Sequence, residues 1–214
     1  FFNNLAIAAQ RKVNQGKKVF VLDFDSHFGD GTAEIFHNTD MVLYSSLHQY
    51  PAYPSKGWVD EIGKEKGKGY TVNIPLPARS GDDLFVYSLG FLLNIARQFK
   101  PDIVGVSAGF DGHHSDLLLG LELSSHSYFR AGRMFSKEFE NIFATLEGGY
   151  SLKYLPKLVR NFIAGVNKEQ MPFQEKETTS LPAVRKEYKN RIGALVDNLS
   201  PYWSFKDIEP LKND

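Results

Sequence analysis

Several features that would narrow the function are missing from this sequence. The chain of 214 residues contains no cysteine, so it forms no disulfide and a metal ion must be held by imidazole and carboxylate groups. Basic and acidic residues both number 25, which gives no reason to expect direct binding to nucleic acid or to an anionic membrane. No apolar run approaches the roughly 18 residues that span a bilayer, and the first residues do not resemble a signal peptide. We therefore expect a soluble, cytoplasmic protein.

Short apolar runs without polar alternation recur along the chain, which is typical of strands buried on both faces of a parallel sheet. They cover residues 19–22, 42–47, 72–76, 103–106 and 142–146. Helical patterns cover residues 4–15, 82–99, 124–139 and 152–163. This alternation predicts a layered α/β fold with a mainly parallel central sheet.

The composition changes near residue 165, where lysine, glutamate and threonine become more frequent. Residues 174–180 are typical of a solvated connector, and residues 183–197 have a helical pattern. We expect residues 171–214 to form a polar connector and a helical tail that packs on the domain formed by residues 1–170.

Polar residues follow three of the predicted strands, at the sheet edge where parallel α/β folds bind ligands. In the segment Asp23-x-Asp25-x-His27 a period of two places the three side chains on one side of an extended chain. Together with Asp111, which follows another strand, two carboxylates and one imidazole match a zinc site that leaves a position open for water. The alternative to a zinc site is an acidic turn whose carboxylates cap a following helix. The pattern alone leaves both interpretations open.

Longer motifs occur in a fixed order over roughly residues 1–165. They are Phe2-Asn3-Asn4, Asp23-x-Asp25-x-His27-x-Gly29-Asp30-Gly31-Thr32, Ser46-Leu47-His48, Tyr70-Thr71-Val72-Asn73-Ile74-Pro75-Leu76, Ser107-Ala108-Gly109-Phe110-Asp111 and Glu147-Gly148-Gly149-Tyr150. This series resembles the signature of the histone deacetylase superfamily, which includes acetylpolyamine amidohydrolases and acetoin-utilisation-type proteins. The resemblance implies a three-layer arginase/deacetylase-like fold and zinc-dependent hydrolysis of an acetylated amine, such as acetyl-lysine in a protein, acetylpolyamine or a similar amide.

The resemblance also assigns roles to individual residues. It makes Asp25, His27 and Asp111 the zinc ligands and Tyr150 the catalytic residue that polarises the acetyl carbonyl. A tyrosine alone is more often a packed aromatic, but Tyr150 directly follows two glycines at a predicted strand end. Leu118 and Gly149 fall at positions that line the substrate tunnel.

Two monovalent-cation sites are implied as well. The first potassium site would use Asp23, Ser46 and the backbone carbonyls of Asp25, His27 and Leu47, and it would support the zinc loop. The second would use Phe36, Thr39, Val42 and Tyr70, for which ordinary turn and core roles are the alternative.

The chain departs from the family pattern in two respects. The family places a tandem histidine pair, which acts as general base and acid, upstream of the Phe-Asn-Asn segment, whereas the only adjacent pair here, His113-His114, follows the third zinc ligand. We expect that pair to form hydrogen bonds in the loop after Asp111, and we expect residues 1–170 to be the C-terminal portion of a deacetylase domain without its first strands and active-site loop. Phe28 stands where the family carries a second histidine.

Two alternatives follow. The chain is a catalytically incompetent fragment or a non-catalytic zinc-binding relative, which the absent histidine pair favours. An arginase-type ureohydrolase is less well supported, because Asp111-Gly112-His113 lacks the second aspartate of a two-metal site. A homo-oligomer or a separate N-terminal segment is a further expected partner.

Overall fold

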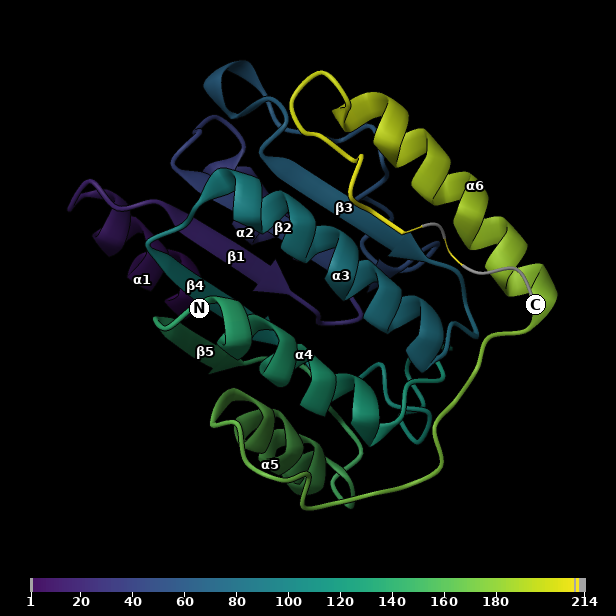
Figure 1. Cartoon of the computed structure of the whole chain (residues 1–214). Coiled ribbons are helices and arrows are strands. Elements are labelled where there is room, and N and C mark those ends of the chain that lie inside the picture. Colours follow the sequence, from purple (N-terminus) through teal and green to yellow (C-terminus); the bar gives the residue numbers. More distant parts are fainter. Residues whose placement is uncertain (1, 210, 212–214) are drawn as a thin grey trace.

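A parallel β-sheet lies at the centre of the computed structural model, which describes residues 2–209 and 211. Within these residues the strands are β1 (Val19–Asp23), β2 (Val42–Gln49), β3 (Thr71–Leu76), β4 (Ile103–Ala108) and β5 (Ile142–Leu146). Their order across the sheet is β3-β2-β1-β4-β5, and each neighbouring pair is parallel (Figure 1). The predicted parallel α/β sheet is confirmed, with β1 as its central strand.

Helices cover both faces of the sheet (Figure 1). They are α1 (Asn4–Val13), α2 (Asp30–Phe36), α3 (Asp82–Phe99), α4 (Ser125–Glu138) and α5 (Leu155–Val166). Val19 and Val21 of β1 belong to the apolar cluster that contains buried residues of α1 and α2, whereas Phe20 and Leu22 belong to the cluster formed with α3 and α4. This alternation divides the core between two faces and gives the three layers that the resemblance implied.

Two predicted elements differ from the structure. Helix α5 begins three residues later than expected, with Pro156 in its first turn, where a proline lacking an N–H donor is favoured. Strand β5 was expected to be buried on both faces, but this is wrong: its residues are partly exposed, and Leu146 is 59% exposed. The reason is that β5 lies at the sheet edge and pairs with β4 alone among the described strands.

The C-terminal segment packs on the same core. Helix α6 (Pro182–Leu199) buries Tyr188, Leu195 and Leu199 in the larger apolar cluster. The guanidinium of Arg191 donates hydrogen bonds to the backbone oxygens of Tyr50 (2.8 Å) and Pro75 (3.1 Å). Residues 210 and 212–214 of the predicted tail lie outside the described residues.

The connector before α6 is held by specific polar contacts, although its composition suggested a solvated segment. Asn161 of α5 accepts a hydrogen bond from the Phe173 amide (3.0 Å) and donates one to the Phe173 carbonyl (2.7 Å). The Thr178 amide donates to Asp82 at the start of α3 (2.8 Å).

Of the helices in the described part of the chain, none is long and apolar enough to cross a membrane.

Candidate metal centre

Three predicted zinc ligands meet at the carboxyl ends of two neighbouring strands. Asp25 and His27 follow β1, and Asp111 follows β4. Nδ1 of His27 lies 2.7 Å from Oδ2 of Asp111 and 3.3 Å from Oδ1 of Asp25. One potential ligand atom from each residue lies within 4.8 Å of the others. The structure therefore brings together the two carboxylates and one imidazole that the sequence pattern singled out.

Backbone groups from adjacent loops hold the two carboxylates in place. The Ser26 amide donates to Oδ1 of Asp111 (2.9 Å), and the Gly148 amide donates to Oδ2 of Asp25 (2.7 Å). Gly109 and Gly148 both approach Asp25 so closely that a Cβ atom at either position would overlap its carboxylate. These two glycines let the backbone of neighbouring strand ends reach a shared point.

The electrostatics of this cluster favour a cation. Burial and the nearby charge of Asp25 raise the pKa of Asp111. Hydrogen bonds from His27 and Gly148 outweigh burial and lower the pKa of Asp25. The hydrogen bonds to Asp111 and Asp25 raise the pKa of His27 to about 10, so without a metal ion the imidazole stays protonated and offsets one of the two carboxylate charges. A divalent cation would replace this proton, and the donor set fits zinc.

Tyr150 lies on the loop after β5, next to the carboxylates. Its amide donates to Oδ2 of Asp116 (2.8 Å), and its side chain is 57% exposed. Partial burial, and then the charges of Asp25, Asp111 and Asp116, raise the pKa of Tyr150, so its hydroxyl stays protonated and available as a donor. Asp116 was missed by the sequence analysis, because no local pattern links it to the tyrosine that it positions.

Comparison with known proteins identifies the family of this chain. The family model described as the histone deacetylase domain matches residues 1–166. This chain belongs to the histone deacetylase family. Over 160 residues it is 41% identical to a protein named "Probable deacetylase" from Archaeoglobus fulgidus, covering 72% of this chain and 45% of that protein. The chain is 35% identical over 168 residues to the acetylpolyamine amidohydrolase of Burkholderia pseudomallei, covering 77% and 49%.

Solved structures of histone deacetylases have the same fold. The crystal structure of the HDA15 HD domain aligns with a TM-score of 0.83 and 31% identity, over 94% of this chain and 56% of that one. The structure of the histone deacetylase Clr3 gives a TM-score of 0.84 at 29% identity, over 100% and 37%. The deacetylase-like fold is confirmed, and the chain spans about half the length of the two curated relatives described above.

The residues of the first predicted potassium site lie directly beside the cluster of Asp25, His27 and Asp111. Asp23 and Ser46 are paired across β1 and β2, and Leu47 follows Ser46. Asp23 is buried, accepting hydrogen bonds from the Tyr44 hydroxyl at Oδ2 (3.0 Å) and the Asp25 amide at Oδ1 (3.1 Å). The position fits a role in supporting the zinc loop, while potassium binding stays a prediction.

The residues of the second predicted potassium site surround the start of β2. The Thr39 amide donates to the Phe36 carbonyl (3.3 Å), and the Tyr70 carbonyl accepts from the Tyr44 amide (2.9 Å). Val42 is the first residue of β2. These contacts also suit ordinary turn and strand roles, so a cation role for these residues stays a prediction.

The two predicted tunnel residues and Phe28 lie in different surroundings. Leu118 is 59% exposed, and its amide donates to Oδ1 of Asp116 (3.2 Å). Gly149 has a φ of +135°, a conformation that favours glycine. The tunnel role of both residues stays a prediction. Phe28 is buried, and its ring centroid lies 6.3 Å from that of Tyr44 and 5.0 Å from that of His48, which identifies it as a packing residue.

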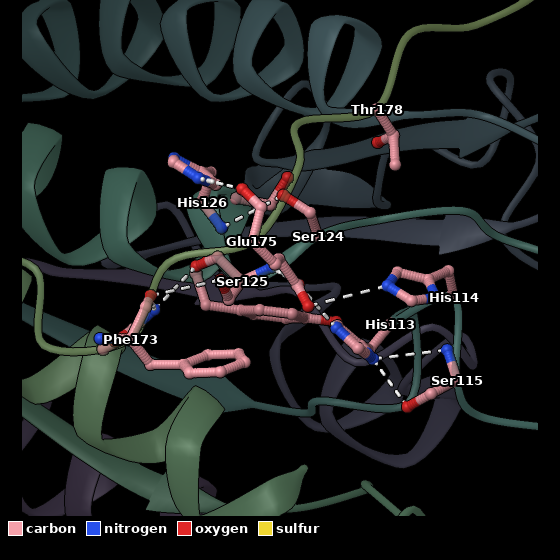
Figure 2. Close-up of polar contacts among 12 residues, drawn as sticks. His113, His114, Ser115, Ser124, Ser125, His126, Phe173, Glu175 and Thr178 are labelled. Atoms are coloured by element: carbon pink, nitrogen blue, oxygen red, sulfur yellow. Dashed lines mark hydrogen bonds and ion pairs between the residues drawn. The ribbon is translucent and has the colours of Figure 1, made fainter.

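The adjacent histidines His113 and His114 lie in the loop between β4 and α4, after Asp111, as expected, and Figure 2 shows both rings beside Glu175. Nε2 of His113 lies 2.8 Å from Oε1 of Glu175 in the connector. The prediction that this pair takes part in hydrogen bonding is confirmed for His113. The connector residue Glu175 was not identified from the sequence, because its partner is 62 positions away.

Proposed function

We propose that this chain carries the zinc-binding part of an enzyme that hydrolyses an acetylated amine. The convergence of Asp25, His27 and Asp111 at the carboxyl ends of β1 and β4 carries the proposal. Membership of the histone deacetylase family supports the reaction type. The substrate would be acetyl-lysine in a protein, an acetylpolyamine or a similar amide. A cytoplasmic location and potassium binding belong to the same proposal.

The chain's own residues would supply the electrophilic part of the reaction. Bound zinc would activate water and polarise the acetyl carbonyl. Asp25, His27 and Asp111 would hold the ion, while the protonated Tyr150 hydroxyl donates a hydrogen bond to the carbonyl oxygen where negative charge develops. Asp116 would fix the backbone of Tyr150 through its amide.

Proton transfer to the leaving amine has no assigned group among the described residues. His48 is buried between Ser46 Oγ (2.9 Å) and the Gly57 carbonyl (3.0 Å), and His113 is bonded to Glu175. General acid–base catalysis contributes roughly 10²- to 10⁴-fold to such reactions. We therefore propose that these residues alone bind zinc with little turnover, and that residues outside this sequence supply the proton-transfer group.

Zinc titration by calorimetry tests the metal assignment. The Asp111→Asn variant keeps an acceptor for the Ser26 amide but removes one charged ligand, so zinc affinity at this cluster should fall by at least about a hundredfold. The matched control is Asp40→Asn, a change of an exposed carboxylate outside the cluster, which should leave zinc affinity unchanged. Unchanged zinc binding in Asp111→Asn would rule out the assignment.

Turnover is tested separately, with acetyl-lysine peptide and acetylpolyamine substrates. The chain should show little hydrolysis even when loaded with zinc, and the protein encoded by the complete reading frame should hydrolyse at least one of them. A zinc-loaded complete protein that hydrolyses neither would favour the non-catalytic alternative.

A further inference from the structure

A second group of metal-ligating side chains lies where the loop after β4 meets the connector before α6. It consists of His113, His114 and Glu175, and one potential ligand atom from each lies within 4.8 Å of the others (Figure 2). Nε2 of His113 lies 2.8 Å from Oε1 of Glu175, and Nε2 of His114 lies 3.7 Å from Oε2 of the same carboxylate. Two imidazoles therefore face one carboxylate from the same loop.

These three side chains form a site that is closed on one side and open on the other. The His113 side chain is fully buried, whereas the His114 side chain is 41% exposed and the Glu175 side chain 15% exposed. A surface cavity of about 670 Å³ adjoins the group. It is lined by His114, Glu122, Lys176, Glu177, Thr178 and Thr179. An ion would enter from this side and keep a position for water.

Contacts from outside the group hold two of the three ligands. Nδ1 of His113 lies 2.7 Å from the hydroxyl of Ser115, which in turn donates to the hydroxyl of Ser151 (3.0 Å). The Ser115 amide also donates to this Nδ1 (3.2 Å), so without an ion Nε2 carries the hydrogen that faces Glu175. An ion bound at Nε2 would displace that hydrogen, and Nδ1 would then donate to the Ser115 hydroxyl, the kind of contact that orients a metal-ligating histidine. Oε1 of Glu175 also accepts from the Ser125 amide at 2.5 Å. The buried part of the site is thus fixed in position before an ion binds.

Of the three side chains, His114 has the fewest polar contacts. Its ring nitrogens have no hydrogen bond to any of the described residues. The ring lies tilted against that of His113, with 4.2 Å between the centroids, and its Nε2 lies 3.7 Å from Oε2 of Glu175. An ion placed between the two imidazoles and the carboxylate would occupy the space that this 3.7 Å separation leaves. Two imidazoles, one carboxylate and one open position form a donor set that zinc favours.

We propose that His113, His114 and Glu175 bind a divalent transition metal, with zinc as the ion that the donor set fits. This site is distinct from the cluster of Asp25, His27 and Asp111. The bound ion would join two segments that are 62 residues apart in the chain. Because Asp116 of the same loop holds the Tyr150 amide, an ion here would also stiffen the loop that positions Tyr150.

Calorimetric titration of the chain with zinc, without an affinity tag, tests the proposal. Wild type should show two binding events. The His114→Ala variant changes an exposed side chain and should lose only the event that belongs to His113, His114 and Glu175, which we call the second event. Asp111→Asn should lose only the event that belongs to Asp25, His27 and Asp111. The matched control is His37→Ala, a histidine outside both groups, which should keep both events. A second event that persists in His114→Ala, or that His37→Ala weakens equally, would show adventitious binding and overturn the proposal.

Hydrogen exchange gives a readout that does not depend on counting ions. In the Asp111→Asn background, zinc should slow the exchange of connector amides 173–178 by at least about tenfold, because an added cross-link suppresses local opening. The effect should disappear when His114→Ala is combined with Asp111→Asn. Equal protection in both variants would contradict binding at this site, whatever the outcome for deacetylation.

Discussion

Nδ1 of His27 lies 2.7 Å from Oδ2 of Asp111, although 84 positions separate the two residues in the chain. Their proximity follows from the sheet, because β1 and β4 are neighbours and Asp23 is paired with Ser107 just before each loop begins. The Asp111 side chain is fully buried, and Asp25 adds a second carboxylate. Without a metal ion, the fold therefore holds buried negative charge, and His27 is the basic side chain that pairs with it in the described part of the chain.

Zinc should stabilise the fold through this cluster. The His114→Ala variant leaves Asp25, His27 and Asp111 as the one proposed zinc-binding group. In this background, zinc at a thousand times its dissociation constant should raise the free energy of unfolding by about 4 kcal/mol. Asp111→Asn in the same background should show no such increase. Without zinc it should be at least as stable as its parent, because the raised pKa of Asp111 means that the fold disfavours its charge, and Asp25 remains to pair with His27. Urea unfolding with and without zinc measures both effects. A metal-free Asp111→Asn protein that is several kcal/mol less stable would contradict this account.

Asp82 should be among the side chains most important for stability. This buried carboxylate accepts hydrogen bonds from the Ser124 amide and hydroxyl, the Ser127 hydroxyl and the Thr178 amide, at 2.6–2.8 Å. Asp82→Ala would leave buried donors without a partner and should cost about 3–5 kcal/mol, as judged by urea unfolding. Asp40→Ala, at an exposed position, should stay within about 0.5 kcal/mol of wild type.

Much of the fold could be predicted because its signals are local. The apolar runs of β1 to β4 are continuous, and the predicted ligands Asp25, His27 and Asp111 lie just after two of them. The exposure of β5 could not be predicted in the same way. Its apolar sequence resembles that of the central strands, and its position at the sheet edge depends on which strands pair, a property of the whole chain.

The polar contacts that support the site were harder to predict. Asp116 and Glu175 are ordinary acidic residues in the sequence, and each gains its role from a partner brought close by folding, Tyr150 for the first and His113 for the second. Helix α2 (Asp30–Phe36) was foreseen only in the alternative interpretation of the acidic motif, in which a helix follows the turn. In the structure the same segment contains two of the predicted ligands, Asp25 and His27, and the start of that helix.

Asp116 should control the order of the Tyr150 loop without affecting metal binding. Asp116→Ala removes the acceptor of the Tyr150 amide, so exchange of that amide should accelerate by about tenfold, the effect of losing roughly 1.4 kcal/mol of local stability. Zinc affinity at Asp25, His27 and Asp111 should stay unchanged. Hydrogen exchange of the segment 148–152 measures the effect. Leu117→Ala is the control, because that side chain is 94% exposed. If the Tyr150 amide exchanged at the wild-type rate in Asp116→Ala, Asp116 would not be the residue that positions Tyr150.

Two glycine substitutions should have opposite effects. A Cβ atom at Gly148 would overlap the carboxylate of Asp25, whereas a Cβ atom at Gly193, inside α6, would have no atom within 4 Å. Gly148→Ala should displace Asp25 and weaken zinc binding by at least about tenfold, while overpacking costs about 1–3 kcal/mol of stability. Gly193→Ala should instead raise the free energy of unfolding by about 0.5–1 kcal/mol, because alanine favours helix. Calorimetry and urea unfolding of both variants separate the effects: wild-type zinc affinity in Gly148→Ala would mean that close approach of the backbone is not what positions Asp25.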